Sequence, residues 1–152
     1  MILYRLASSL YPDLKGTGGL TNGGRWHHAG NRVTYLASSR SLAAWEKLMH
    51  IESLALIPDN LVMLTVDVPD EIIKVIDDSE FPVGWNSTIP GSASKDFGTT
   101  FLEDLKDAVL RVPSVVISGE YNYILNPLHP LAARVVILGI DPFNYDERLG
   151  NK

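Results

Sequence analysis

Residues 33–53, VTYLASSRSLAAWEKLMHIES, place a short β-rich run directly before a segment with the apolar spacing of a helix. β-Branched and aromatic residues favour a strand over residues 33–36. Ser38 and Ser39 are good N-caps, so we expect a helix from that point to about residue 53. The stretch therefore predicts a strand followed at once by a helix.

Shorter signals predict the other elements. Residues 2–4 favour a strand, and so do residues 61–68, where apolar side chains fall on both faces and indicate burial on both sides. We also expect a short apolar run at 72–76, a mobile loop at 81–99, a helix at 100–109, and strands at 112–117 and 134–140, the last two separated by a polar segment containing Asn and Pro. The sequence thus predicts an α+β fold with two helices and five or six strands.

Composition limits the possible classes of function. A chain of 152 residues fits a single compact domain over residues 1–152. The sequence has no cysteine, which excludes disulfides, thiolate metal sites and a Cys nucleophile. The formal net charge is −5 with scattered Lys and Arg, which disfavours direct binding of nucleic acid. We see no signal peptide and no apolar run beyond the six residues 135–140, so we expect no membrane span and a cytoplasmic protein.

Glu46 lies at the edge of the predicted apolar side of the helix. With Leu42 set at 0°, a rotation of about 100° per residue places Trp45 near 300°, Met49 near 340° and Glu46 near 40°. A desolvated carboxylate without a partner costs several kcal/mol. Glu46 therefore either reaches water at the edge, or finds a cation or donors, or lines a cleft.

Arg25 raises a similar question in a loop rich in glycine. Six of the seventeen residues 15–31 are glycine, which lets the backbone approach a ligand closely. Arg25 follows two of these glycines, and its planar guanidinium suits a phosphate or a carboxylate. The alternative is an ordinary solvated loop arginine. Adjacent His27 and His28 diverge and share no metal-ligand spacing with the other histidines, so we expect no metal site.

Blocks along nearly the whole chain resemble the RES-domain family, the toxin half of bacterial Xre–RES toxin–antitoxin pairs. The blocks are GGRW at 23–26, VTYLA at 33–37, LAAWE at 42–46, RVPSVV at 111–116, NYILNPLHP at 122–130, DPF at 141–143 and DERL at 146–149. The Arg, Glu and Ser that name the family match Arg25, Glu46 and Ser114. Tyr35 matches the family's aromatic residue on the strand before the Glu-bearing helix.

Two departures from the family pattern stand out. The family commonly has Asn after the Arg-Trp pair, whereas this chain has His27 and His28. The loop before the second helix often ends in a Gly/Trp pattern, and here it is Phe-Gly-Thr-Thr-Phe at residues 97–101. The first departure lies beside the expected site and bears on how substrate is held.

The resemblance implies a fold similar to that of ADP-ribosyltransferase toxins and NAD as the substrate. It also implies NAD depletion that halts growth, and inhibition by an Xre-type antitoxin, a helix-turn-helix DNA-binding protein, in a hetero-oligomer. NAD cleavage releases neutral nicotinamide from a cationic ring, so the leaving group needs no proton and one carboxylate is enough. Glu46 is the expected stabiliser of the ribose cation.

The other matched residues keep alternative roles. Arg25 would hold the pyrophosphate, or orient the ribose and Glu46. Tyr35 would stack on the nicotinamide, or be a half-buried strand tyrosine. Ser114 would bind the carboxamide, position Glu46, or be satisfied by backbone. Asn122 and Asn126 are assigned only to closing their own loop.

Three hypotheses of function remain. The first is a toxin that acts as an NAD glycohydrolase or phosphorylase, with water or inorganic phosphate as the acceptor. The second is transfer of ADP-ribose to a protein. The third is a catalytically silent module that only binds an antitoxin, which the joint presence of Arg25, Tyr35, Glu46 and Ser114 argues against.

Overall fold

The structure is a computed structural model that describes residues 1–150. Within these residues two α-helices and seven strands occur, so the α+β prediction is confirmed, with one strand more than expected. The elements are β1 (Ile2–Ser8), β2 (Thr34–Ala37), α1 (Arg40–Met49), β3 (Leu61–Asp67), β4 (Ile73–Lys74), α2 (Ser92–Asp104), β5 (Val109–Pro113), β6 (Tyr121–Leu125) and β7 (Val136–Pro142). Short 3-10 turns, such as η1 (Thr17–Leu20), join them.

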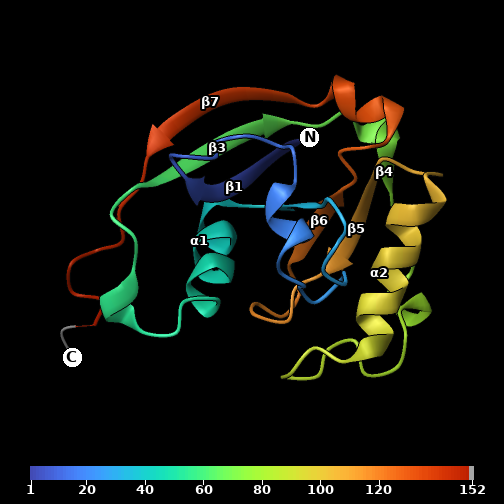
Figure 1. Cartoon of the computed structure of the whole chain (residues 1–152), viewed down its shortest axis with the longest axis horizontal. Coiled ribbons are helices and arrows are strands. Elements are labelled where there is room, and N and C mark those ends of the chain that lie inside the picture. The colour runs from blue at the N-terminus through green and yellow to red at the C-terminus, as the bar shows by residue number, and fades with distance from the viewer. Residues whose placement is uncertain (151–152) are drawn as a thin grey trace.

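The strands form one sheet in the order β4-β5-β6-β2-β1-β3-β7 (Figure 1). All neighbours are antiparallel except β4 and β5. β1 pairs with β3 along its whole length, but its register with β2 is the single pair Tyr4↔Ala37. β2 in turn pairs with β6, where Ala37 lies opposite Asn122. β2 therefore connects β1, β3 and β7 on one side of the sheet with β4, β5 and β6 on the other.

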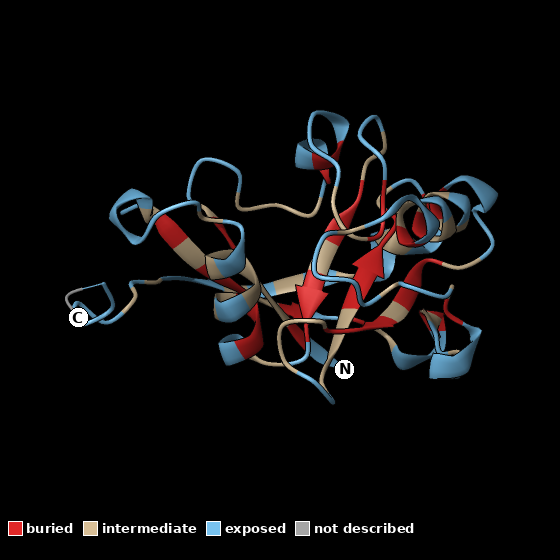
Figure 2. Ribbon diagram, turned by 90° about the horizontal axis from the view of Figure 1, so that it is seen from below, coloured by how far each residue is buried: buried red, intermediate tan, exposed pale blue. Residues whose placement is uncertain are grey.

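Buried residues follow the central strands, and exposed residues lie on the outer turns of helices and on loops (Figure 2). β3 is buried on both faces, as its sequence predicts: Met63 belongs to the cluster under α1, and Leu64 belongs to the cluster on the other face. A third cluster brings Trp26 together with α2 and with the inner side chains of β5 and β6. The three clusters place both helices against the sheet.

The start of α1 is predicted correctly, but its buried face is not. Ser39 is the N-cap, and its Oγ accepts a hydrogen bond from the Leu42 N–H at 3.0 Å. Trp45 is 49% exposed and Met49 is 63% exposed, so the prediction that they line the apolar side is wrong. The helix packs through Leu42 and the small Ala43 instead, and it ends at Met49 rather than near residue 53.

Several boundaries in the second half of the chain are also wrong. α2 begins at Ser92, inside the segment predicted as a loop, and ends at Asp104. β5 precedes the predicted strand 112–117 by three residues, and β4 covers only two residues of the run 72–76. The polar segment before β7 contains β6, a strand that was not predicted. β7 itself begins and ends two residues later than predicted.

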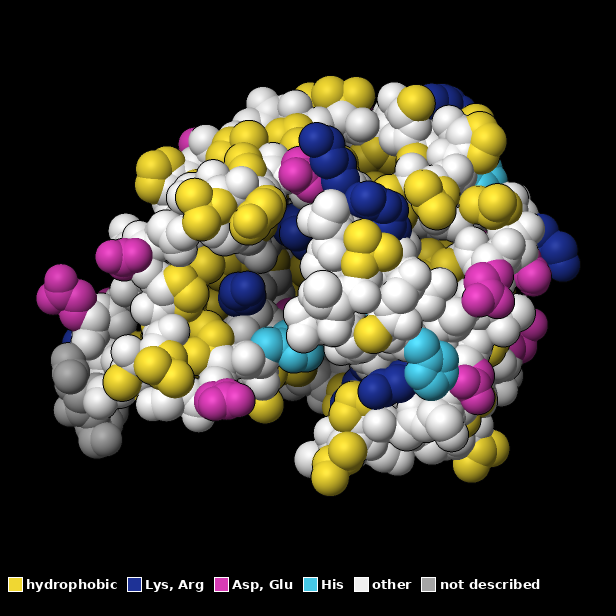
Figure 3. All heavy atoms as spheres, viewed as in Figure 1, with side chains coloured by type: hydrophobic (Ala, Val, Ile, Leu, Met, Phe, Trp, Pro, Cys, Tyr) yellow, Lys and Arg dark blue, Asp and Glu magenta, His cyan; other side chains and the backbone are white. Residues whose placement is uncertain are grey.

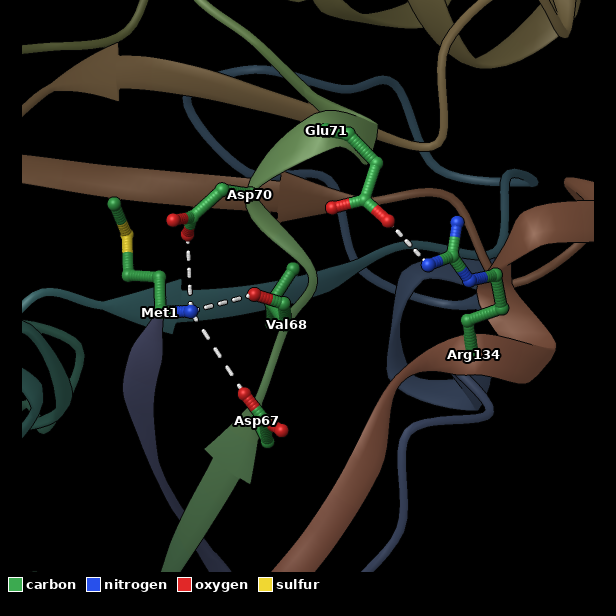
Figure 4. Close-up of polar contacts among 6 residues, drawn as sticks. All are labelled: Met1, Asp67, Val68, Asp70, Glu71 and Arg134. Carbon is green, nitrogen blue, oxygen red and sulfur yellow. Dashed lines mark hydrogen bonds and ion pairs between the residues drawn. The ribbon is translucent and has the colours of Figure 1, made fainter.

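Ionic contacts fasten the corner where β3 ends (Figure 4). The Met1 amino group donates to the Val68 carbonyl at 2.8 Å and lies 3.0 Å from an Asp70 oxygen. Beside this corner, Arg134 pairs with Glu71 and links the turn before β7 to the turn before β4.

No helix within residues 1–150 has both the length and the apolar character that are needed to span a membrane.

Candidate functional site

The Glu46 carboxylate is held by two donors from distant parts of the sequence. Ser114 Oγ donates to Glu46 Oε1 at 2.7 Å, and Asn122 Nδ2 donates to the same oxygen at 2.5 Å. Ser114 directly follows β5, and Asn122 lies on β6 opposite Val112 of β5. Pairing of these two strands therefore brings both donors under α1. Glu46 finds donors instead of only reaching water, which decides between the alternatives left open by the sequence.

The Ser114 hydroxyl is fully committed. Its oxygen accepts hydrogen bonds from the backbone N–H groups of Val116 at 3.1 Å and Ile117 at 3.0 Å. Its own hydrogen therefore points to Glu46, which is the geometry of a positioning residue. Within residues 1–150, Glu46 Oε2 makes no hydrogen bond. One carboxylate oxygen is thus fixed, and the other is free to meet a ligand.

Arg25 is tied to the segment before α2. Its Nη1 donates to the carbonyl oxygens of Trp85 and Ser87, both at 2.8 Å. Burial lowers the pKa of Arg25, while the negative charge of Glu46 raises it. Arginine nevertheless stays charged at any physiological pH. Arg25 is therefore a half-buried cation near Glu46 that also holds a loop, and not a solvated loop arginine.

Tyr35 belongs to a chain of hydrogen bonds with the glycine-rich loop. Its hydroxyl oxygen accepts from the Trp26 N–H at 3.2 Å and lies 2.8 Å from His27 Nδ1. Burial raises the pKa of Tyr35 well above its usual range, so the hydroxyl stays protonated. The ring packs against the cluster that contains Trp26. Arg25 and Glu46 both act electrostatically on this hydroxyl, which places Tyr35 close to them.

An aromatic cluster fixes the residue next to Arg25. Trp26 is 2% exposed, and its ring centroid lies 5.3 Å from that of Phe81 and 6.1 Å from those of Trp85 and Phe97. Gly98 of α2 lies against the Trp26 backbone, and a Cβ atom there would fall 1.8 Å from the Trp26 carbonyl oxygen. α2 can therefore approach Arg25 and its neighbours only because residue 98 is glycine.

A cavity of about 360 Å³ opens beside Ser114. It is lined by Asp78, Trp85, Asn86 and residues 113–115 and 118–121. Figure 3 shows the surface notched between the α1 side of the molecule and the loop before α2. Of the four predicted site residues only Ser114 lines this cavity. A second cavity, of about 610 Å³, lies against the start of β7 and touches none of the four.

Two residues were not predicted from the sequence. Asn122, assigned only to its loop, contacts Glu46; recognising the β5–β6 hairpin would have placed it beside Ser114. Arg5 on β1 is a largely buried cation, and its Nε has no hydrogen-bond partner among the described residues. Burial lowers the pKa of Lys47, next to Glu46, and the Arg5 charge lowers it further. A charged residue inside an apolar strand was the available signal for Arg5.

The described residues include no group of three or more His, Asp or Glu side chains that could hold a metal ion. The arrangement is instead one carboxylate held by neutral donors, with cations near it. Such a site can stabilise a positive charge that grows on a bound ligand.

Comparisons with known proteins agree with this arrangement of elements. A family model described as "RES domain" matches residues 2–146. A Sphingobium sp. protein named "Prs ADP-ribosylating toxin" is 36% identical over 92% of this chain and 88% of its own length. Proteins named "Toxin Res" from Photorhabdus laumondii and Pseudomonas putida are 38% and 36% identical, over 84% and 98% of this chain and 83% and 99% of their own lengths.

A solved structure shares the fold. A chain in the crystal structure of the M. tuberculosis MbcT–MbcA toxin–antitoxin complex superposes with a TM-score of 0.72 at 17% identity, over 94% of this chain and 84% of that one. The match to the family model covers almost the whole described chain, and the relatives above 30% identity cover more than two thirds of it. The chain therefore belongs to the RES domain family, whose relatives named above are toxins.

Proposed function

We propose that this protein is the toxin of a toxin–antitoxin pair and that it consumes NAD by breaking the bond between nicotinamide and ribose. The observation that carries the proposal is the Glu46 carboxylate, with Oε1 fixed by two donors and Oε2 making no hydrogen bond to residues 1–150. The names of the related toxins, one of them an ADP-ribosylating toxin, support an NAD-linked activity.

The chemistry suits a single carboxylate. As the C1′–N bond breaks, its electron pair goes to the nicotinamide nitrogen, which leaves as a neutral ring. Positive charge then grows on the ribose, where Glu46 Oε2 would accept from a ribose hydroxyl and stabilise the cation. Water captures C1′ and releases a proton to solvent, whereas inorganic phosphate would capture C1′ through an unprotonated oxygen and release none. The negative Glu46 is effective because Ser114 and Asn122 fix it before the reaction.

The neighbouring residues would hold the substrate and the walls of the site. Arg25 keeps the segment around Trp85 in place and supplies positive charge for the anionic part of NAD. Arg5 and Lys47 add cationic groups near α1. Tyr35 presents a ring whose hydroxyl is already bound, so it would contribute aromatic contact with nicotinamide and no proton. Ser114 positions Glu46.

An Xre-type antitoxin, a helix-turn-helix DNA-binding protein, is the proposed partner, in a hetero-oligomer within the cytoplasm. The resemblance to Xre–RES pairs supports this choice, and the solved structure with the same fold is a toxin–antitoxin complex. The second candidate function is transfer of ADP-ribose to a protein, which the name of the Sphingobium relative favours.

The decisive experiment incubates the purified protein, freed of any partner, with adenine-labelled NAD, with and without inorganic phosphate. We expect free nicotinamide together with ADP-ribose, or with a phosphorylated ADP-ribose when phosphate is the acceptor. Label that appears on added cellular protein would favour the second candidate function. Unchanged NAD would contradict both and favour a silent antitoxin-binding module.

Asn122→Ala is expected to lower kcat about tenfold while KM stays within about twofold. The change removes one of two donors to Glu46 Oε1, and a lost positioning hydrogen bond is worth about 1.4 kcal/mol, or a factor of ten. Steady-state kinetics of NAD consumption measure the split. The matched control is Asn144→Ala at an exposed position, which we expect to leave both constants unchanged. A rise in KM alone would show that Asn122 binds substrate instead of holding Glu46.

A further inference from the structure

The tautomer of His27 is fixed by its two neighbours. Nε2 lies 2.8 Å from the Asn22 carbonyl oxygen, which can only accept, so Nε2 carries the hydrogen. In the neutral ring Nδ1 then has only a lone pair, so the Tyr35 hydroxyl donates to it across 2.8 Å. The Tyr35 oxygen in turn accepts from the Trp26 N–H. Each of these three hydrogen bonds therefore has a defined donor and a defined acceptor.

These hydrogen bonds hold the glycine-rich loop on both sides of Arg25. Asn22 precedes Arg25 in the loop, Trp26 and His27 follow it, and Tyr35 stands on β2. His27 is 4% exposed and fits closely, since a Cβ atom at Gly24 would lie 2.9 Å from its ring and 2.9 Å from the Tyr35 hydroxyl. His27 thus joins the Arg25 loop to the strand that leads into the Glu46 helix.

We propose that His27 is a positioning residue of the Arg25–Glu46 site and that it acts only as the neutral imidazole. The activity readout of the proposal rests on the proposed function, whereas the linkage between His27 and Tyr35 does not.

Protonation of His27 removes the hydrogen bond that Tyr35 donates to its Nδ1. A charged ring carries hydrogens on both nitrogens, so Nδ1 can no longer accept from Tyr35. The Tyr35 oxygen already accepts from Trp26, and its own hydrogen is left without this partner. The Trp26 N–H still donates to Tyr35, but the Tyr35 hydrogen has lost its acceptor, so the loop that carries Arg25 is held to β2 less rigidly.

The surroundings of the ring keep it neutral near pH 7. The titratable groups that face it are Tyr35 on β2, Lys95 on α2 and the adjacent His28. Burial lowers the pKa of His27, the charges of Lys95 and His28 lower it further, and the Asn22 carbonyl opposes them. The unfolded chain binds the proton near pH 6.5 and the folded chain only below that value, so stability falls as the pH drops from about 6.5.

The test measures kcat for NAD consumption by the full chain between pH 5 and 8. We expect the wild-type protein to lose turnover at least fivefold on the acid side of its range. His27→Gln keeps a donor and an acceptor but cannot titrate, so it should retain turnover at pH 7.5 and lose the acid decline. His27→Leu keeps the volume without polar groups and should lose at least tenfold at every pH.

His28→Gln is the control, because His28 is exposed and pairs with Asp96 at the surface. It should keep the acid decline, moved at most to higher pH because the His28 charge that lowers the pKa of His27 is removed. A Gln variant at position 27 with the wild-type acid decline would overturn the proposal.

A second readout needs no NAD. Nitrogen-15 NMR of the four histidines should show His27 as the Nε2–H tautomer with a pKa below the ordinary value, and Tyr35→Phe should raise that pKa or broaden its signals. A His27 that titrates at or above the ordinary value would contradict the proposal. If the wild-type protein consumes no NAD, that result counts against the proposed function. The NMR measurement then decides the role of His27 by itself.

Discussion

Replacing Glu46 with glutamine is expected to lower the rate of NAD cleavage by two to three orders of magnitude and to leave the fold intact. The glutamine amide oxygen can still accept from Ser114 and Asn122, so the local geometry is kept. The negative charge that would face the ribose cation is lost, and removal of one such preorganised group typically costs about 100- to 1,000-fold. Initial rates of nicotinamide release measure the effect.

Two controls make the Glu46→Gln result interpretable. Glu52→Gln changes an exposed carboxylate just beyond α1 and should keep the wild-type rate. The thermal midpoint of Glu46→Gln should stay within a few degrees of wild type. In cells, expression of the wild-type chain alone should arrest growth and lower NAD, and the Gln variant should do neither. Wild-type turnover in the variant would show that the role assigned to Glu46 is wrong.

Trp26→Ala is expected to lower the free energy of unfolding by about 3–5 kcal/mol. The ring is 2% exposed and contacts three other aromatic rings, so its removal leaves a large apolar void. A typical domain has only about 5–15 kcal/mol of stability, so the variant is close to unfolding. Urea titration followed by circular dichroism gives the difference.

Trp45→Ala is the matched control for Trp26→Ala. Trp45 is 49% exposed on α1, so its removal should change the free energy of unfolding by only about 0.5 kcal/mol. Equal effects of the two substitutions would show that the aromatic cluster does not hold the Arg25 loop. The comparison also tests the structure against the sequence pattern, which placed Trp45 on the buried side.

The first half of the fold follows from local signals. The strands β1, β2 and β3 and the Ser39 cap are each indicated by residues that are close together in the sequence. For such elements, strand propensity and capping determine the local structure. The face of α1 could not be found this way. Ala43 is buried and Trp45 is exposed because a small residue lets the helix lie close to the sheet, which depends on the partner surface.

The second half of the fold depends on tertiary contacts. α2 begins with Ser-Ala-Ser-Lys-Asp, a weak helical sequence, and it forms where Gly98 packs on Trp26. β6 is short, contains Asn122 and ends two residues before Pro127. Asparagine and proline are both typical of loops, yet β6 lies between β5 and β2. The partners of Glu46 were hidden for the same reason, since Asn122 becomes its neighbour only when β6 is placed.

The spacing of the Glu46 donors also has a consequence during synthesis. Ser114 and Asn122 follow Glu46 by 68 and 76 residues, and β2 has no β6 to pair with until residue 125 is made. At roughly 5–20 residues per second, a ribosome takes about 3 to 15 seconds to cover that distance. Throughout this interval the nascent chain carries Arg25 and Glu46 without the groups that fix the carboxylate. The proposed toxicity therefore begins only after residue 125 has been synthesised.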